Sequence, residues 1–189
     1  MFRDPEFRYD RELRCTVMNT SVFLPHPREH IFNFFSDAVQ LERITPKWVN
    51  FQILTPTPIH IQKGTLIDYK IRLRGIPMTW RTEISDWNPP FQFTDRQLRG
   101  PYLLWEHTHR FEEVDGGTLM TDEVHYRVPG GRLINWLLVQ NDVNRIFIFR
   151  RQTMLELFGG TEHGSTEQDG PALLKSPAEY SAAGSERSQ

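Results

Sequence analysis

The chain of 189 residues has 38% hydrophobic and 24% charged side chains, which indicates one ordinary globular domain able to bury a core. Its formal net charge of −2 at pH 7 argues against a nucleic-acid partner, because binding to the phosphate backbone needs a concentrated positive field. One cysteine allows neither an internal disulfide nor a thiolate zinc cluster, and it favours a reducing, cytoplasmic location. The sequence has no signal-peptide pattern and no apolar stretch near the ~20 residues that span a bilayer, so no stable membrane insertion is expected.

Composition divides the chain into three parts. Residues 1–12 are charged and predict a loose N-terminal lead-in. Residues 13–158 hold nearly all the large apolar side chains and predict the folded domain. Residues 159–189 are rich in Gly, Ser, Glu, Ala and Pro, a composition typical of a disordered tail because it cannot bury enough surface to order itself.

The folded part begins with a β-rich segment over 15–24, after which Pro27 predicts the first turn of a helix. Ser36-Asp37 can cap a second short helix that ends before Thr45-Pro46. Strands are then expected, each bounded by Pro, Gly or Asn, over 48–54, 65–74, 78–87, 91–98, 102–114 and 118–128. Nearly all the links between them are short, which predicts an antiparallel sheet.

The first tight hairpin is expected at Gly75-Ile76. This turn would pair Ile71 with Trp80 and Tyr69 with Thr82 on a largely apolar face. The opposite face would then carry charged side chains, as expected for a sheet with one solvent-exposed face.

The second hairpin, at Asp115-Gly116, gathers an unusual mixture of side chains on one face. It would pair His109 with Asp122 and His107 with Val124. The complete face consists of Trp105, His107, His109, Phe111, Met120, Asp122, Val124 and Tyr126. Because aromatic rings and ionisable groups alternate there, this face indicates the wall of a ligand cavity rather than an ordinary core.

A long helix is predicted from Arg132 to Phe158, about 40 Å in length and long enough to lie across the whole sheet. Its apolar stripe consists of Trp136, Val139, Val143, Ile146, Phe147, Met154 and Leu157. Arg150 falls in step with that stripe, where a charge is costly unless it is paired or reaches water. It could hold a ligand carboxylate, or it could snorkel to solvent or form an ion pair with the sheet.

Several segments within residues 14–158 resemble an uncharacterised bacterial ligand-binding subfamily of the START-like, Bet v 1-like (SRPBCC) superfamily. These segments are Ile44–Pro46, Gly64–Tyr69, Gly75–Pro77 with Trp80, Trp87–Pro90, Asp95–Tyr102, Trp105–His109, Gly116–Thr118, Ile146–Phe147 and Arg150–Arg151. The resemblance implies an α+β helix-grip fold, in which a seven-stranded antiparallel sheet wraps around a long C-terminal helix, with two short helices after the first strand. It also implies a deep apolar cavity between the sheet and the long helix.

Relatives implied by this resemblance include polyketide cyclases and dehydratases, coenzyme Q-binding proteins and plant hormone or allergen carriers. The fold alone does not fix the activity. No catalytic motif of the family maps onto this sequence, and no cofactor is expected.

The candidate catalytic residues are His107, His109 and Asp122. A carboxylate beside an imidazole favours its charged form and fixes its orientation, so the group could anchor a ligand carbonyl or act as an acid–base pair. It could equally be a buried structural hydrogen bond. Two imidazoles and one carboxylate could also bind a metal ion. Neighbouring strands place only two of these three groups close together, however, and the resemblance implies no metal, so no metal is expected.

The full set of expected ligand-binding residues is Tyr69, Trp80, Gln97, Trp105, His107, His109, Asp122, Tyr126 and Arg150. The aromatic members join a flat apolar body to a hydrogen-bonding atom, which suits an aromatic or quinone-like ligand, although plain core packing explains each of them as well.

The leading hypothesis is a monomeric or homodimeric protein that binds and perhaps carries a hydrophobic small molecule, such as a lipid, quinone or polyketide. The alternative is a polyketide cyclase or dehydratase that uses a His/Asp acid–base pair. A third possibility, a stress or cell-division accessory that acts through protein contacts, rests only on an association of such domains with division inhibitors.

Overall fold

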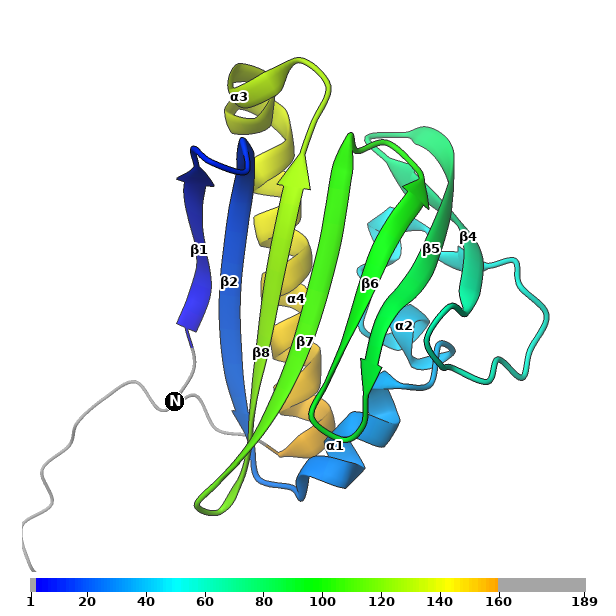
Figure 1. The fold of residues 1–189 in the computed structure, drawn as a ribbon, viewed down its shortest axis with the longest axis vertical. Coiled ribbons are helices and arrows are strands. Elements are labelled where there is room, and N and C mark those ends of the chain that lie inside the picture. The colour runs from blue at the N-terminus through cyan, green and yellow to red at the C-terminus, as the bar shows by residue number, and fades with distance from the viewer. Residues whose placement is uncertain (1–2, 160–189) are drawn as a thin grey trace, which may run out of the picture.

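A computed structural model describes residues 3–159 of the chain, so almost all of the segment expected to be a disordered tail lies outside the described residues. One antiparallel sheet of eight strands dominates the fold (Figure 1), in the order β1-β2-β8-β7-β6-β5-β4-β3. The strands are Arg3–Asp10 (β1), Cys15–Leu24 (β2), Gln52–Ile53 (β3), Leu66–Leu73 (β4), Ile76–Asn88 (β5), Gln92–Arg99 (β6), Leu104–Val114 (β7) and Gly117–Arg127 (β8).

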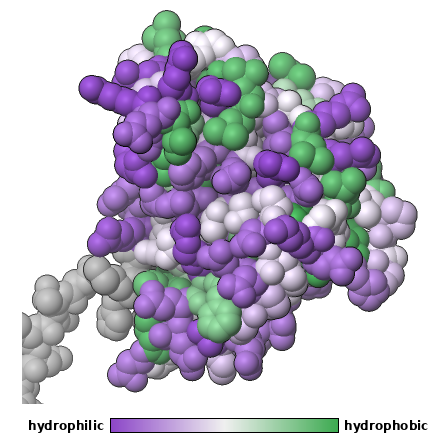
Figure 2. All heavy atoms as spheres, viewed as in Figure 1, coloured by the Kyte–Doolittle hydropathy of each residue, from purple (hydrophilic) through white to green (hydrophobic). Residues whose placement is uncertain are grey.

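The helices cover one face of this sheet. They are α1 (Arg28–Phe35), α2 (Gln40–Arg43), the 3₁₀ turn η1 (Lys47–Val49), α3 (Gly131–Ile134), the π-helical turn η2 (Asn135–Val139) and α4 (Gln140–Phe158). Figure 1 shows α4 running behind the strands, and the outer face seen in Figure 2 carries mostly hydrophilic side chains. This arrangement confirms the α+β helix-grip architecture, with eight strands instead of seven.

The additional strand is β1, which the sequence analysis placed in a loose lead-in. Its residues are mostly exposed, because β1 lies at the sheet edge and pairs only with β2. Because most of its side chains are exposed, this edge strand has the charged composition of a loop, and its sequence does not indicate a strand. Asp4 in β1 forms an ion pair with the buried Arg151 of α4, and Phe7 packs against the core.

The predicted long helix is present, but the π-helical turn η2 interrupts it near its start. A π-turn adds a residue to one turn and so rotates the side chains on either side relative to each other. Trp136, expected in the buried stripe, is 70% exposed, and Leu157 is also exposed. The stripe that does face the sheet includes Val143, Phe147 and Met154.

The register was predicted correctly for one of the two hairpins and incorrectly for the other. The β7–β8 register agrees with the prediction, pairing His109 with Asp122 and His107 with Val124. In the β4–β5 hairpin the turn lies at Arg74-Gly75, so Tyr69 pairs with Trp80 rather than with Thr82. The pairing is shifted by two residues, which leaves every side chain on its predicted face.

The strand expected over 48–54 is mostly absent, since η1 and the two-residue strand β3 occupy this segment. The largest core cluster joins Phe32 and Phe35 of α1 to the sheet and to Met154 and Phe158 of α4. Within residues 3–159, no helix has the length and apolar character that crossing a membrane would require.

Candidate functional site

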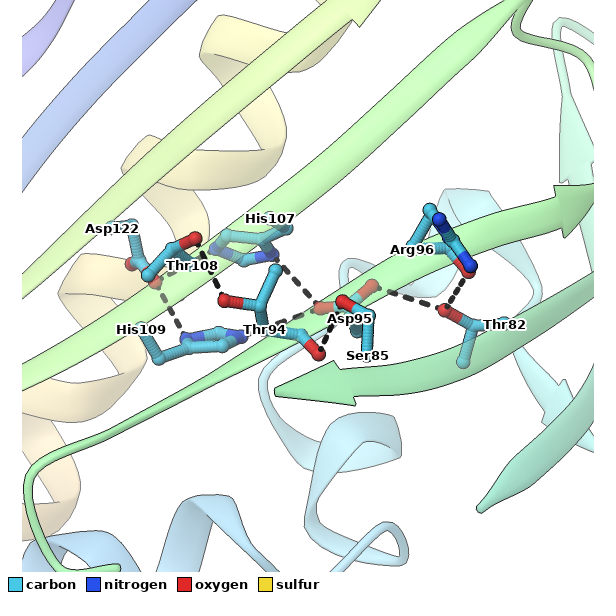
Figure 3. Close-up of polar contacts among 9 residues, drawn as sticks. All are labelled: Thr82, Ser85, Thr94, Asp95, Arg96, His107, Thr108, His109 and Asp122. Atoms are coloured by element: carbon cyan, nitrogen blue, oxygen red, sulfur yellow. Dashed lines mark hydrogen bonds and ion pairs between the residues drawn. The ribbon is translucent and has the colours of Figure 1, made fainter. Parts of the chain in front are cut away.

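Two histidines and two aspartates form a buried cluster on the strands β6, β7 and β8 (Figure 3). We call His107, His109, Asp95 and Asp122 the His/Asp cluster. The two histidines are separated by one residue on β7, so both project from the inner face of the sheet. Their ring centroids lie 3.9 Å apart, and both side chains are almost completely buried.

Asp122 contacts both imidazole rings with one carboxylate oxygen. Its Oδ1 lies 2.9 Å from His107 Nε2 and 2.8 Å from His109 Nδ1. The predicted contact between His109 and Asp122 is therefore present, and His107 shares it. Because Asp122 is itself buried on β8, it fixes the orientation of both rings from the side away from the cavity.

Asp95 of β6 faces the other nitrogen of each ring. Its Oδ2 lies 3.5 Å from His107 Nδ1 and 3.6 Å from His109 Nε2. Thr82 donates a hydrogen bond of 3.2 Å to Asp95 Oδ1, which holds the carboxylate in place. The sequence analysis did not select Asp95, although it lies two residues from Gln97 and therefore shares its side of the strand.

Burial and mutual charge set the pKa values of the two histidines in opposite directions. Burial lowers the pKa of His109, but the hydrogen bond and charge of Asp122, followed by those of Asp95, outweigh it and leave this pKa raised. Burial and then the charge of His109 lower the pKa of His107, and Asp122 does not fully offset them. Because the two rings lie 3.9 Å apart, they titrate as one coupled pair.

Both carboxyl groups of the cluster favour their charged forms. Burial raises the pKa of Asp122, but hydrogen bonds from His107 and His109 outweigh it and hold this pKa well below its usual range. Burial also raises the pKa of Asp95, but the hydrogen bond and charge of His109 outweigh it and leave this pKa lowered. The cluster is thus a concentration of negative charge that is partly balanced by imidazole and, at Asp95, by the charge of Arg150.

A cavity of about 140 Å³ lies between the inner face of the sheet, α4 and the segment around η1. Six of the expected ligand-binding residues line it, namely Tyr69, Trp80, Trp105, His107, His109 and Arg150. Asp95 also lines it, and most of the remaining wall is apolar. The cavity therefore combines an apolar interior with one polar wall, the arrangement typical of small-molecule sites.

Aromatic rings form one continuous side of this cavity. Tyr69 stacks on Trp80 with 5.7 Å between ring centroids, and Trp105 meets Trp80 edge-on at 5.4 Å. Tyr102 lies 4.7 Å from Trp105 and extends the group. Such rings hold one another rigidly and offer flat surfaces to a bound ring.

Arg150 projects from α4 into the same cavity. It is 9% exposed, and its Nε and Nη1 atoms have no hydrogen-bond partner among residues 3–159. Its guanidinium carbon lies 5.1 Å from the centroid of the Phe147 ring. Trp80 Nε1 is a second buried donor without a partner in the described part of the chain. Among residues 3–159 Arg150 forms no ion pair with the sheet at contact distance, although its charge helps to lower the pKa of Asp95.

Three expected ligand-binding residues lie outside the cavity lining. Asp122 stands behind the histidines. The side-chain amide of Gln97 donates a hydrogen bond of 2.7 Å to the carbonyl oxygen of Tyr102, in the loop between β6 and β7. The amide is therefore already hydrogen-bonded to the local backbone. Tyr126 is fully buried against Tyr102 and Trp105, and burial raises its pKa to about 12.

Comparison with known proteins gives a family and a fold. The family model described as "Polyketide cyclase / dehydrase and lipid transport" matches residues 24–143. No curated protein sequence matches significantly.

Among solved structures, protein Ms6760 from Mycobacterium smegmatis has a TM-score of 0.60 at 15% identity, over 82% of this chain and 96% of that chain. The Zhui aromatase/cyclase from Streptomyces sp. R1128 has a TM-score of 0.60 at 14% identity, over 76% and 93%. These two similarities establish the fold. A nucleoside-diphosphate sugar epimerase from Corynebacterium glutamicum is 26% identical, with a TM-score of 0.53, over 73% of this chain but only 28% of that chain.

The family match covers more than half of the sequence, and it falls on strands β3 to β8, most of the cavity wall and the first turn of α4. The chain belongs to the polyketide cyclase/dehydrase and lipid transport family, within the START-like, Bet v 1-like superfamily.

Proposed function

We propose that the protein binds and carries a hydrophobic small molecule, such as a lipid, quinone or polyketide, in the cavity between the sheet and α4. The observation behind the proposal is an apolar, aromatic cavity whose wall includes Arg150 and Trp80, which have buried donors without partners. An unpaired buried donor costs about 1–3 kcal/mol. A ligand that brings a carbonyl or carboxylate oxygen into an apolar setting would recover that cost.

The size of the cavity limits what fits without rearrangement. At about 140 Å³ it approaches the ~150 Å³ of an engineered cavity that holds benzene, and it is smaller than the ~300–1,000 Å³ of typical ligand sites. One ring or a short acyl chain therefore fits as the cavity stands. A longer ligand, or a second fused ring such as that of a naphthoquinone, requires the side chains of α4, such as Ile146 and Phe147, to repack.

The family supports the same class of ligand, since its description joins polyketide cyclases and dehydrases to lipid transport. The Zhui protein, which shares the fold, is named as an aromatase/cyclase. The cytoplasmic location favoured by the single cysteine stays a prediction, as does a monomeric or homodimeric state.

A second candidate function is a cyclase or dehydratase reaction. It is favoured by the position of His107 and His109, whose rings reach the wall of the same cavity and lie between two carboxylates. Such an enzyme would exchange protons between this pair and a bound polyketone. His107→Gln and His109→Gln variants separate the two functions, because a carrier can lose affinity in them but has no turnover to lose.

Binding is tested by native mass spectrometry of the purified protein and by calorimetric titration with 1,4-naphthoquinone and naphthalene. We expect a 1:1 complex with naphthoquinone and affinity for naphthalene lower by about 10-fold or more, since a hydrogen bond to a charged group contributes about 1.5–3 kcal/mol. Trp80→Phe should weaken the quinone complex, whereas Trp136→Phe, at an exposed tryptophan outside the cavity, should not. No copurified molecule together with no binding of either compound would refute the proposal.

A further inference from the structure

We propose that His107, His109 and Asp95 form a binding site for a divalent transition-metal ion in the cavity wall, with Asp122 holding the two imidazoles from behind. Two imidazoles and one carboxylate are a ligand set that zinc and its first-row neighbours accept. All three groups line the cavity, so a bound ion would keep an open side toward the cavity interior. This proposal does not depend on the hydrophobic ligand.

The spacing of the candidate donor atoms fits a shared ion better than it fits hydrogen bonds. Asp95 Oδ2 lies 3.5 Å from His107 Nδ1 and 3.6 Å from His109 Nε2. Hydrogen bonds between nitrogen and oxygen have lengths of about 2.7–3.2 Å. Tetrahedral zinc, with bonds of about 2.0–2.2 Å, places neighbouring donor atoms about 3.3–3.5 Å apart. The donor atoms of the three residues all lie within 4.8 Å of one another.

The hydrogen-bonding capacity of the imidazoles supports the same conclusion. Each ring turns one nitrogen to Asp122, at 2.8 or 2.9 Å, and the other to Asp95. A neutral imidazole has one N–H group. In His107 the hydrogen bond with Asp122 uses it, and in His109 the nitrogen 2.8 Å from Asp122 is the better placed of the two to carry it. The second nitrogen of each ring then presents a lone pair to an oxygen lone pair of Asp95, which is repulsive unless a cation lies between them.

One metal ion satisfies both rings at once. Protons alone would need two imidazolium rings packed 3.9 Å apart inside the protein, where like charges are strongly unfavourable. A divalent ion would also balance the two buried carboxylates, Asp95 and Asp122. A carboxylate behind metal-bound imidazoles is a recurrent feature of metal sites, and Asp122 Oδ1 is hydrogen-bonded to His107 Nε2 and lies 2.8 Å from His109 Nδ1.

No metal was expected from the sequence, because neighbouring strands bring only two of His107, His109 and Asp122 close together and the family resemblance implies no metal. In the structure Asp122 is on the side away from the cavity, and Asp95 completes the set from β6. The third group comes from the strand on the opposite side of β7, and no tight turn fixes the register of that pair.

The site is tested on protein freed of metal with a chelator and then titrated with Zn²⁺ by calorimetry and with Co²⁺ by visible absorption. We expect one Zn²⁺ per chain, and Co²⁺ bands of the intensity produced by four or five ligands. Asp95→Asn and His109→Gln should each lower Zn²⁺ affinity by more than about 100-fold, and Asp122→Asn by about 10- to 100-fold. His125→Gln is the matched control, because His125 contacts Glu123 on the outer face of β8 and should bind Zn²⁺ as the unmodified protein does.

The proposal is overturned if the unmodified protein binds neither ion at one site, or if Asp95→Asn leaves Zn²⁺ binding unchanged while His125→Gln reduces it. Circular dichroism shows which variants fold. If His109→Gln does not fold, the Co²⁺ spectrum of the unmodified protein and the Asp95→Asn titration still decide. Naphthoquinone binding to the metal-free protein separates the metal site from the proposed ligand binding. Naphthoquinone can bind even if the protein binds no metal, and it can fail to bind even if the protein binds metal.

Discussion

Replacing Arg150 with Met should stabilise the ligand-free protein while weakening its hold on a ligand. The guanidinium has two buried N–H groups without partners, each costing about 1 kcal/mol at the lower end of the expected range. Met keeps a flexible apolar chain but loses the contact with the Phe147 ring, which contributes about 1 kcal/mol. The net effect is a stabilisation of about 1 kcal/mol, or about 2–4 °C in Tm for a domain of this size.

The assay is thermal unfolding of the ligand-free variant, followed by titration with 1-naphthoate. Without the guanidinium, affinity for the carboxylate should fall by about 10- to 100-fold, as expected for the loss of a charged hydrogen bond. Arg145→Met is the matched control, since Arg145 lies exposed on the same helix, also over an aromatic ring, and buries no donor. A fall of several degrees in the Tm of Arg150→Met, with unchanged affinity, would show that Arg150 is a structural residue and refute this reasoning.

Two further substitutions test the cavity and the sheet. Val143→Phe should fill the cavity and abolish naphthoquinone binding, at a cost of about 1–3 kcal/mol in stability. The control Val39→Phe, at an exposed site, should leave binding intact. Calorimetry measures the binding of naphthoquinone, and urea unfolding measures the stability of each variant. Gly117→Ala should destabilise by about 1–3 kcal/mol in urea unfolding, because its Cβ would lie 2.3 Å from the Leu24 backbone oxygen, and a stability equal to that of the unmodified protein would contradict the packing at this turn.

The part of the site that the sequence predicted best is the β7–β8 hairpin. Its turn residue Gly116 adopts φ of 80°, which suits glycine, and a two-residue turn leaves one register open. That register brings His109 to Asp122 without any knowledge of the remaining fold. Local turn chemistry was sufficient there because the two strands are consecutive and tightly joined.

The β4–β5 hairpin shows where turn chemistry misleads. Both turn residues have positive φ, 51° for Arg74 and 84° for Gly75, and an arginine gives no sign of that conformation. The turn was therefore placed one residue late. Because the resulting shift is two residues, the assignment of inward-facing side chains such as Tyr69 and Trp80 survived it.

The missing member of the His/Asp cluster, Asp95, shows the limit of arguments from single hairpins. Its neighbour His107 is on the next strand, but residues 100–103 join β6 to β7 without a two-residue turn. The alternation along β6 did place Asp95 inward with Gln97, and that signal was present in the sequence. No pattern in the sequence could show that Gln97 would instead bond to the backbone of Tyr102.

Ligand binding in the cavity is tested most directly by the indole N–H resonances of the five tryptophans in a ¹⁵N-labelled protein titrated with 1,4-naphthoquinone. Trp80 and Trp105 line the cavity, whereas Trp136 lies within the π-helical turn η2, is exposed and is not part of the cavity wall. We expect the Trp80 and Trp105 resonances to move and saturate together while that of Trp136 stays in place. Movement of Trp136 alone, or no movement of Trp80 at millimolar quinone, would contradict binding in the cavity.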